Sequence, residues 1–349
     1  MRRLTLLLLT IALCAFFVGC TSSDNKTNGD GQTTPTPTAA PTENAATPTE
    51  APATSTPTPQ DDPTPTPTVG PHAKIDNHVP TDYSQYRLKN VGSIVEITYE
   101  SRDYLNNPDA VVVKPAFVYL PPNYDETKQY NVLYLMHGIG GNESEWGMTG
   151  LTSIVKAIMD NLIRYGDIEP FIVVTPNGRS YADFANTSGD SRSFYVFGQE
   201  LRNDLIPYME SHFAVYHDDD MTAVRDHRAM AGLSMGGMQT INIGMCECLD
   251  ILSWFGTFSA APTSYPANQI AEIIGSDKFK DYKINYMYNI CGLQDKTAYW
   301  SASAAAKDLP SYTDKLKVDE NFMWQELNGV HDFGIWYLGF YNFAQLVFK

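Results

Sequence analysis

The pattern of apolar and polar positions divides the chain into three parts. A mostly apolar run from Leu4 to Val18 stands at the N-terminus, and a long stretch of Thr, Pro, Ala and Ser follows it to about residue 71. From about Ala73 onward, short apolar runs of strand length alternate with stretches in which apolar residues recur every three or four positions. We therefore expect a folded domain over residues 73–349.

The short apolar runs predict the strands of a sheet. Ile94 to Tyr99 and Val111 to Leu120 are typical of an antiparallel pair, and the next run, Asn131 to Met136, is apolar nearly throughout, as in a strand buried on both faces. Further strands are expected at Phe171 to Thr175, His227 to Gly232, Trp254 to Ser259, Tyr286 to Cys291 and Phe322 to Leu327.

Helices are expected over residues 151–165, 197–211 and 335–347. In the second of these, apolar residues recur every four positions and share one face: Phe197, Leu201, Leu205 and Met209. Strands and helices of this length in alternation predict the α/β class, with a mostly parallel central sheet covered by helices on both faces.

A candidate nucleophile lies where one predicted strand runs into a helix. Residues 232–236 read Gly-Leu-Ser-Met-Gly and fit G-x-S-x-G, the nucleophile elbow. The strand-to-helix turn of this motif is crowded, so that both glycines are needed. We therefore predict Ser234 as the nucleophile; the alternative is a glycine turn in the core with an incidental serine.

The base and the acid are sought after Ser234, because the triad of the α/β-hydrolase fold follows the chain order Ser, Asp or Glu, His. A serine hydroxyl needs a base to take its proton and a carboxylate to fix the tautomer of that base. His331 is the one histidine that follows Ser234, and it lies on a loop just past the last predicted strand. The alternative is an exposed loop histidine with no catalytic part.

Asp295 is the predicted acid. It comes directly after the apolar strand that ends at Cys291, at the carboxyl edge of the sheet where the sites of open α/β folds gather. Other acidic residues between the serine and the histidine remain alternatives and lie in polar stretches: Asp250, Asp277, Asp281, Asp308 and Asp314.

An oxyanion hole is expected from two backbone amides, because the negative charge that forms during acyl transfer must meet preorganised donors. One is the amide of Met235, the residue after the nucleophile. The other is expected in the loop His137-Gly-Ile-Gly-Gly after the third strand, and we choose Ile139, with Gly138 and Gly140 as alternatives. His137 itself is interpreted as a residue that braces this loop.

Five segments together resemble the esterase D-like group, most closely the bacterial feruloyl and acetyl xylan esterases of carbohydrate esterase family 1. The resemblance covers about residues 85–349 and implies an α/β-hydrolase fold, the triad and oxyanion positions given above, and no metal or cofactor. The segments follow the family's order: YLMHGIGGNESEW (134–146), FIVVTPNG (171–178), HRAMAGLSMGGMQT (227–240), ICGLQD (290–295) and GVHDFGIW (329–336).

The N-terminus is typical of a secretory leader, with two arginines before an apolar run that is shorter than the roughly 20 residues of a membrane-spanning helix. The run ends Phe17-Val-Gly-Cys20, which resembles the lipobox of bacterial lipoproteins, although Phe17 stands where leucine is usual. We expect residues 1–19 to be removed and Cys20 to be acylated, which anchors the protein to the membrane on the extracellular side of a bacterial cell. A plain secretory leader is the alternative.

The segment from Cys20 to residue 72 is expected to remain unfolded, because its Thr- and Pro-rich composition cannot bury apolar surface. Proline keeps such a chain extended, so that it can act as a stalk of about 100 Å or more. We favour a stalk that lets the domain reach large or insoluble material over a passive tail.

Charge and cysteine content narrow the partners and the chemistry. The formal net charge of −16 argues against nucleic acid, which binds Lys and Arg clusters. The body of the chain has three cysteines, too few for a disulfide framework. Cys246 and Cys248 are interpreted as small buried residues, and a bridge from one of them to Cys291 stays open.

The sequence thus predicts a surface-anchored serine carboxylesterase that releases acyl groups from plant cell-wall polysaccharide such as xylan through an acyl-enzyme. Aromatic residues near the predicted catalytic loops favour a feruloyl or other hydroxycinnamoyl group over acetyl, because they can sandwich a planar ring. The alternative for these aromatic residues is core packing or a platform for sugar. The alternatives are an acetyl xylan esterase, another esterase D-like acyl hydrolase or transferase, and a non-catalytic surface-binding lipoprotein. The aromatic residues considered are Trp146, Tyr265, Tyr299, Trp300 and Trp336.

Overall fold

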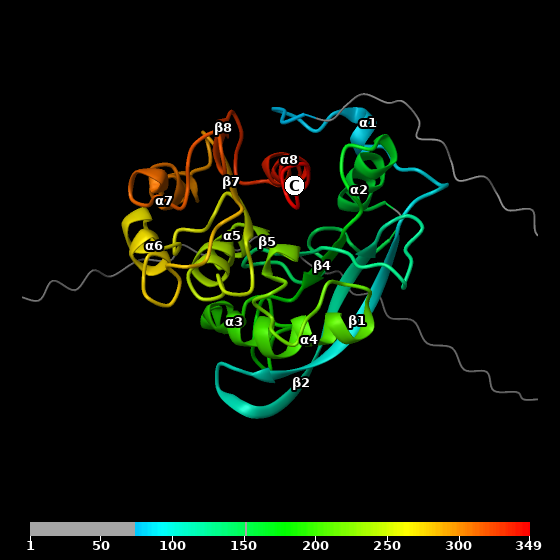
Figure 1. Ribbon diagram of the computed structural model, residues 1–349, viewed down its shortest axis with the longest axis horizontal. Coiled ribbons are helices and arrows are strands. Elements are labelled where there is room, and N and C mark those ends of the chain that lie inside the picture. The colour runs from blue at the N-terminus through cyan, green and yellow to red at the C-terminus, as the bar shows by residue number, and fades with distance from the viewer. Residues whose placement is uncertain (1–73, 151) are drawn as a thin grey trace, which may run out of the picture. The chain divides into compact units, whose positions relative to one another are not determined.

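Eight strands form one mixed sheet in the computed structural model, which describes residues 74–150 and 152–349 (Figure 1). Their order across the sheet is β1-β2-β4-β3-β5-β6-β7-β8. The predicted leader, Cys20 and the Thr- and Pro-rich segment lie outside the described residues. The strands are β1 (Ser93–Asp103), β2 (Asn107–Leu120), β3 (Val132–Met136), β4 (Ile172–Pro176), β5 (Arg228–Leu233), β6 (Trp254–Phe258), β7 (Tyr286–Gly292) and β8 (Phe322–Leu327).

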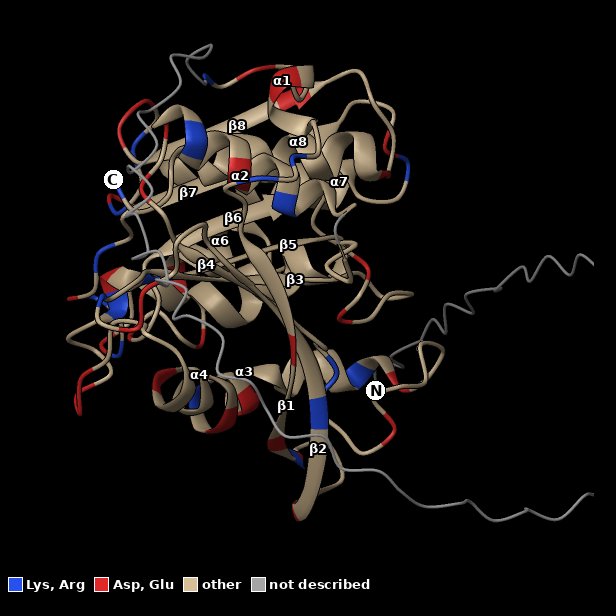
Figure 2. Ribbon diagram, turned by 90° about the vertical axis from the view of Figure 1, so that its right-hand side faces the viewer, with Lys and Arg blue, Asp and Glu red and all other residues tan. Residues whose placement is uncertain are grey.

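The strand directions agree with the sequence pattern. β1 pairs antiparallel with β2, and β2 pairs antiparallel with β4, whereas all pairings from β4 to β8 are parallel. β3 and β4 are buried at every position, as expected of strands covered on both faces. β3, β6 and β7 carry no Lys, Arg, Asp or Glu, and these strands are uniformly tan in Figure 2. The predicted α/β class with a mostly parallel sheet is confirmed.

Helices cover both faces of the sheet and bury two separate apolar clusters against it (Figure 1). On one face lie α2 (Ile154–Tyr165) and α8 (Phe333–Ala344). The other face is covered by α3 (Phe197–Glu200), α4 (Ile206–His212), α6 (Ala267–Ile274) and α7 (Tyr299–Ala306).

The helices of the described region are too short or too polar to cross a lipid bilayer.

The helix predicted over residues 197–211 contains an irregularity. A π-helical turn, Leu201–Leu205, joins α3 to α4, and Pro207 stands at the start of α4. Proline has no N–H to donate to the preceding turn, so a regular α-helical ladder cannot continue through this position. The four apolar residues of the predicted stripe are nevertheless all fully buried.

The three cysteines of the described residues are free thiols in the interior, and burial raises the pKa of each to about 12. Cys246 and Cys248 therefore serve as small buried side chains, as interpreted from the sequence. The bridge to Cys291 is not formed.

Candidate active site

Ser234 lies in a sharp turn between β5 and α5 (Met235–Gln239) at the carboxyl edge of the sheet. Its backbone has φ 50° and ψ −113°, a region that residues other than glycine rarely adopt. A Cβ on Gly232 would lie 2.6 Å from the carbonyl carbon of Gly236, and a Cβ on Gly236 would lie 2.5 Å from the carbonyl oxygen of Met136. Both glycines are required because backbone surrounds the turn, and Ser234 is held at its apex.

The structure brings Ser234, His331 and Asp295 together in one hydrogen-bonded chain. The Nε2 atom of His331 lies 3.0 Å from the Oγ of Ser234, and its Nδ1 atom lies 2.8 Å from the Oδ2 of Asp295. A carboxylate can only accept, so Nδ1–H donates to Asp295 and Nε2 is left to accept from the serine hydroxyl. This tautomer allows His331 to take a proton from Ser234.

Asp295 is held in its charged form. Its side chain is fully buried, and burial alone would raise its pKa, but the hydrogen bonds from His331 and from the amide of Ala298 outweigh burial and keep the pKa below its ordinary value. The Oδ1 atom accepts from the amides of Thr297, at 3.0 Å, and Ala298, at 2.8 Å. The carboxylate is therefore fixed in charge and in orientation.

The other acids considered from the sequence lie elsewhere. Asp250 forms an ion pair with Arg202, and Asp277 forms one with Lys280. The hydrogen bond to the Nδ1 atom of His331 comes from Asp295.

The amides predicted to form the oxyanion hole belong to two segments next to Ser234, the start of α5 and the loop after β3. The loop after β3 reaches the nucleophile, because a Cβ on Gly138 would lie 3.5 Å from the Cβ of Ser234. The amide of Gly138 donates to the Oε2 of Glu145 at 2.6 Å and is thereby engaged. Within the described residues, the amides of Ile139, Gly140 and Met235 have no hydrogen-bond acceptor. Ile139 and Met235 therefore both offer a free donor, and of the two alternatives for Ile139 only Gly140 stays open.

Two residues around this loop were not found from the sequence. Glu145 accepts the hydrogen bond from Gly138, and its burial raises the pKa of its carboxyl. Arg179 is 1% exposed and donates to the carbonyl oxygens of Ile139 and of Gly141, the second at 2.8 Å. The only sequence signal for Arg179 is its place in the polar turn that follows the apolar strand β4.

Of the aromatic residues considered from the sequence, Trp146 and Trp336 are buried. Trp146 is completely buried, and its Nε1 donates to the carbonyl oxygen of Met136, so it packs in the core and cannot stack on an acyl group. Trp336 is 8% exposed and meets the His331 ring edge-on at 5.1 Å. Trp300, 82% exposed, remains as open aromatic surface at the start of α7, whereas the neighbouring Tyr299 is half-buried against the core.

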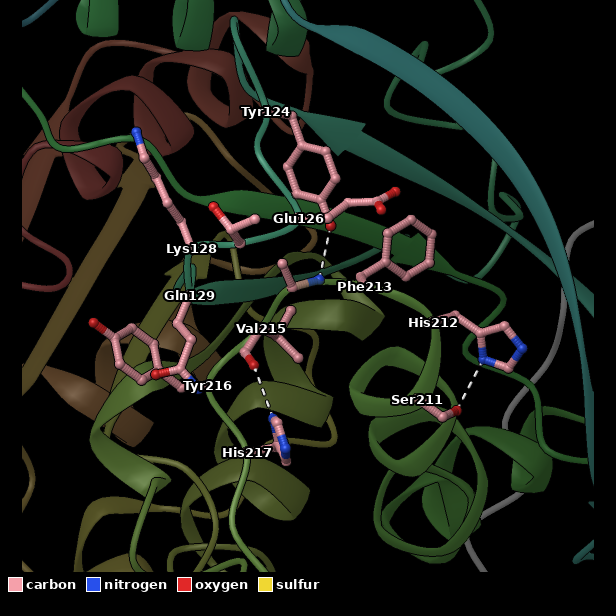
Figure 3. A pocket seen from close by; sticks show the side chains of 12 residues that line it. Tyr124, Glu126, Lys128, Gln129, Ser211, His212, Phe213, Val215, Tyr216 and His217 are labelled. Atoms are coloured by element: carbon pink, nitrogen blue, oxygen red, sulfur yellow. Dashed lines mark hydrogen bonds between the residues drawn. The ribbon is translucent and has the colours of Figure 1, made fainter.

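An open hollow of about 770 Å³ lies away from these residues (Figure 3). Part of its wall, residues 126–129, precedes β3, whereas Ser234 follows β5. Because β3 and β5 are parallel, the hollow lies at the opposite edge of the sheet from Ser234.

Over the described residues, no group of three or more His, Cys, Asp or Glu is placed to hold a metal ion.

Comparison with known proteins finds similarity to esterases. Residues 114–272 match the family model described as "Putative esterase". The chain is 30% identical over 275 residues to an endo-1,4-beta-xylanase/feruloyl esterase of Xylanibacter ruminicola. The aligned region covers 77% of this chain and 33% of the relative. It is 38% identical over 169 residues to endo-1,4-beta-xylanase Y of Acetivibrio thermocellus, which covers 45% of this chain and 14% of the relative. The chain thus spans a third or less of these relatives.

A solved structure is similar over most of the folded region. It is a mutant of the feruloyl esterase module from Clostridium thermocellum in complex with sinapinate, with a TM-score of 0.62 and 28% identity over 81% of this chain and 96% of that one. The fold and the site define the class: the chain has the α/β-hydrolase fold, and its hydrogen-bonded Ser, His and Asp have the arrangement of a serine hydrolase. Within that class the chain is similar to feruloyl esterases.

Proposed function

We propose that the protein hydrolyses ester-linked hydroxycinnamoyl groups, such as feruloyl, from plant cell-wall polysaccharide. The observation that carries this proposal is the hydrogen-bonded chain from Ser234 through His331 to Asp295 at the apex of the elbow. The similarity to proteins named as feruloyl esterases supports the acyl group and the link to xylan.

In the proposed first step, the Nε2 atom of His331 takes the hydroxyl proton of Ser234 while Oγ attacks the ester carbonyl carbon. The carbonyl oxygen becomes negative and accepts hydrogen bonds from the amides of Ile139 and Met235. Asp295, which stays ionised, stabilises the imidazolium. The bond to the sugar oxygen then breaks, His331 returns its proton to that oxygen, and the acyl group remains on Ser234.

In the second step, water replaces the sugar alcohol. His331 takes a proton from the water, and the resulting hydroxide oxygen attacks the acyl carbon through the same oxyanion geometry. Collapse of this intermediate breaks the bond to Oγ, and the proton on His331 passes to Ser234. The products are the free acid and the regenerated enzyme.

The acyl preference can be measured directly. We expect kcat/KM to be higher for a feruloylated than for an acetylated xylo-oligosaccharide, because the exposed ring of Trp300 can stack on a phenolic ring, at about 0.5–1.5 kcal/mol for a good contact. Turnover of 4-nitrophenyl acetate serves as the control for active enzyme. A preference for the acetylated sugar would overturn the hydroxycinnamoyl proposal and leave the triad in place.

We also propose that residues 1–19 are a leader and that acylated Cys20 anchors residues 20–72 as a stalk for the hydrolase domain at 73–349. The Cys20→Ser variant is expected to release active enzyme into the medium or to keep the leader uncleaved, because the acylated thiol is lost. Cys14→Ser, inside the predicted leader, is the matched control and should leave anchoring unchanged. Mass spectrometry of the N-terminal peptide decides: wild-type protein without acyl mass there contradicts the anchor.

A further inference from the structure

His137 is buried between two loops that follow neighbouring strands of the sheet. The imidazole is 1% exposed and belongs to the loop after β3, while Gly178 lies in the loop after β4. The Nε2 atom of His137 is 2.8 Å from the amide nitrogen of Gly178, and its Nδ1 atom is 2.7 Å from the carbonyl oxygen of Gly138. Both ring nitrogens therefore face backbone groups whose hydrogen-bonding roles are fixed.

These partners determine where the ring proton lies. The amide of Gly178 can only donate, so Nε2 must be the bare, accepting nitrogen. The carbonyl oxygen of Gly138 can only accept, so Nδ1 must carry the proton. Burial lowers the pKa of His137 to about 3, and the ring is neutral at any pH at which esterases are assayed.

The carbonyl held by His137 is one end of the peptide unit whose other end is the predicted oxyanion donor. The C=O of Gly138 and the N–H of Ile139 share one planar trans peptide and point in opposite directions. The same oxygen also accepts from the amide of Gly141 at 3.2 Å. Because the carbonyl oxygen of Gly138 is held toward the His137 ring, the N–H of Ile139 points away from that ring. No described residue accepts a hydrogen bond from this N–H.

The loop that supplies Gly178 is itself rigidly supported. Lys114 donates through Nζ to the carbonyl oxygens of Asn177 and Arg179, each at 2.8 Å, and forms an ion pair with Glu200 at 2.6 Å. The side chains of Lys114 and Glu200 are both fully buried. Arg179 then reaches back from this loop to the carbonyl oxygens of the oxyanion loop.

We propose that His137 is a positioning residue for the oxyanion hole: as the Nδ1–H tautomer, selected by the Gly178 amide, it holds the Gly138 carbonyl so that the Ile139 N–H faces the reacting oxygen. Its catalytic consequence rests on the proposed esterase function. The tautomer does not rest on that function.

Two variants separate positioning from mere bracing. In His137→Asn the side-chain NH₂ can take the place of Nδ1–H and still donate to Gly138, whereas in His137→Gln the amide group reaches the place of Nε2 and leaves the Gly138 oxygen without its donor. We expect His137→Gln to lower kcat by roughly 10²–10³ with KM nearly unchanged, the loss typical of one oxyanion donor, and His137→Asn to recover most of kcat.

The measurements are kcat and KM with 4-nitrophenyl acetate, together with the melting temperature of each variant. A purely bracing role would lower stability in both variants and would not separate them in kcat. Equal losses of kcat in the two variants, or a loss confined to KM, would overturn the proposal.

The tautomer is tested without any substrate. Two-bond ¹H–¹⁵N NMR spectra of the ¹⁵N-histidine-labelled protein at about pH 7 should show one buried imidazole with a protonated Nδ1 and a bare Nε2. That signal should be assigned by its loss in His137→Asn. A protonated Nε2 refutes the proposal even if the protein is an active esterase. The expected tautomer without ester hydrolysis by the wild type would instead contradict the proposed function.

Discussion

The Ser234→Ala variant is expected to fold normally and to lose ester hydrolysis, with kcat falling by roughly 10⁶ because triad members act as a unit. The change removes only Oγ, whose partner in the structure is the Nε2 atom of His331. That imidazole is 21% exposed, so water can take the place of the lost hydroxyl. Serine and alanine both carry a Cβ, so the substitution does not change the strain of the backbone at φ 50°. Turnover of 4-nitrophenyl acetate and a thermal melt measure the two effects separately.

Ser264→Ala is a suitable control for this variant. Ser264 lies in the loop after β6, and its hydroxyl donates to the carbonyl oxygen of Ala261 at 2.8 Å. Losing this bond should leave turnover within a few-fold of wild type. If Ser234→Ala stays near wild-type turnover while it remains folded, the assignment of the nucleophile is wrong.

The sheet could be predicted because buried parallel strands require nearly continuous apolar sequence. β8 begins and ends at the predicted residues, Phe322 and Leu327, and β3 differs from its prediction by one residue. α6 and α7 were not predicted, and α7 shows why: it reads YWSASAAA, in which small Ala and Ser side chains give no apolar periodicity. The structure shows that α7 buries Ala302, Ala305 and Ala306 against the core, where close packing replaces large apolar side chains.

The parts of the candidate site that could be predicted are local in the sequence, and the parts that could not be predicted depend on contacts between distant residues. The elbow is visible in the sequence because its strand, serine and helix are contiguous, and the chain order of the fold directs attention to Asp295 and His331. The contacts of Arg179 with the oxyanion loop join residues about 40 positions apart, and no local pattern indicates them. The role of Trp146 was misjudged because nearness to a catalytic loop in sequence does not distinguish an open ring from one buried under that loop.

Replacing Asp295 by asparagine is expected to cut kcat by about 10⁴ while the fold is retained. The amides of Thr297 and Ala298 donate to Oδ1, so they should select the asparagine rotamer that keeps its carbonyl oxygen at this place. The NH₂ group then replaces Oδ2 and faces the Nδ1 atom of His331 as a donor. His331 is driven to the Nε2–H tautomer, which cannot accept the proton of Ser234.

The matched controls for this change are Asp281→Asn and Asp308→Asn, which remove the same charge from exposed positions. Both acids were alternatives on sequence grounds, and the hydrogen bond to His331 comes from neither of them. We expect wild-type kcat in both. The sharpest readout is kcat with 4-nitrophenyl acetate at saturating substrate, since tautomer reversal acts on proton transfer and leaves substrate binding unchanged. A 10⁴-fold loss in either control, with Asp295→Asn active, would move the acid of the triad to that residue.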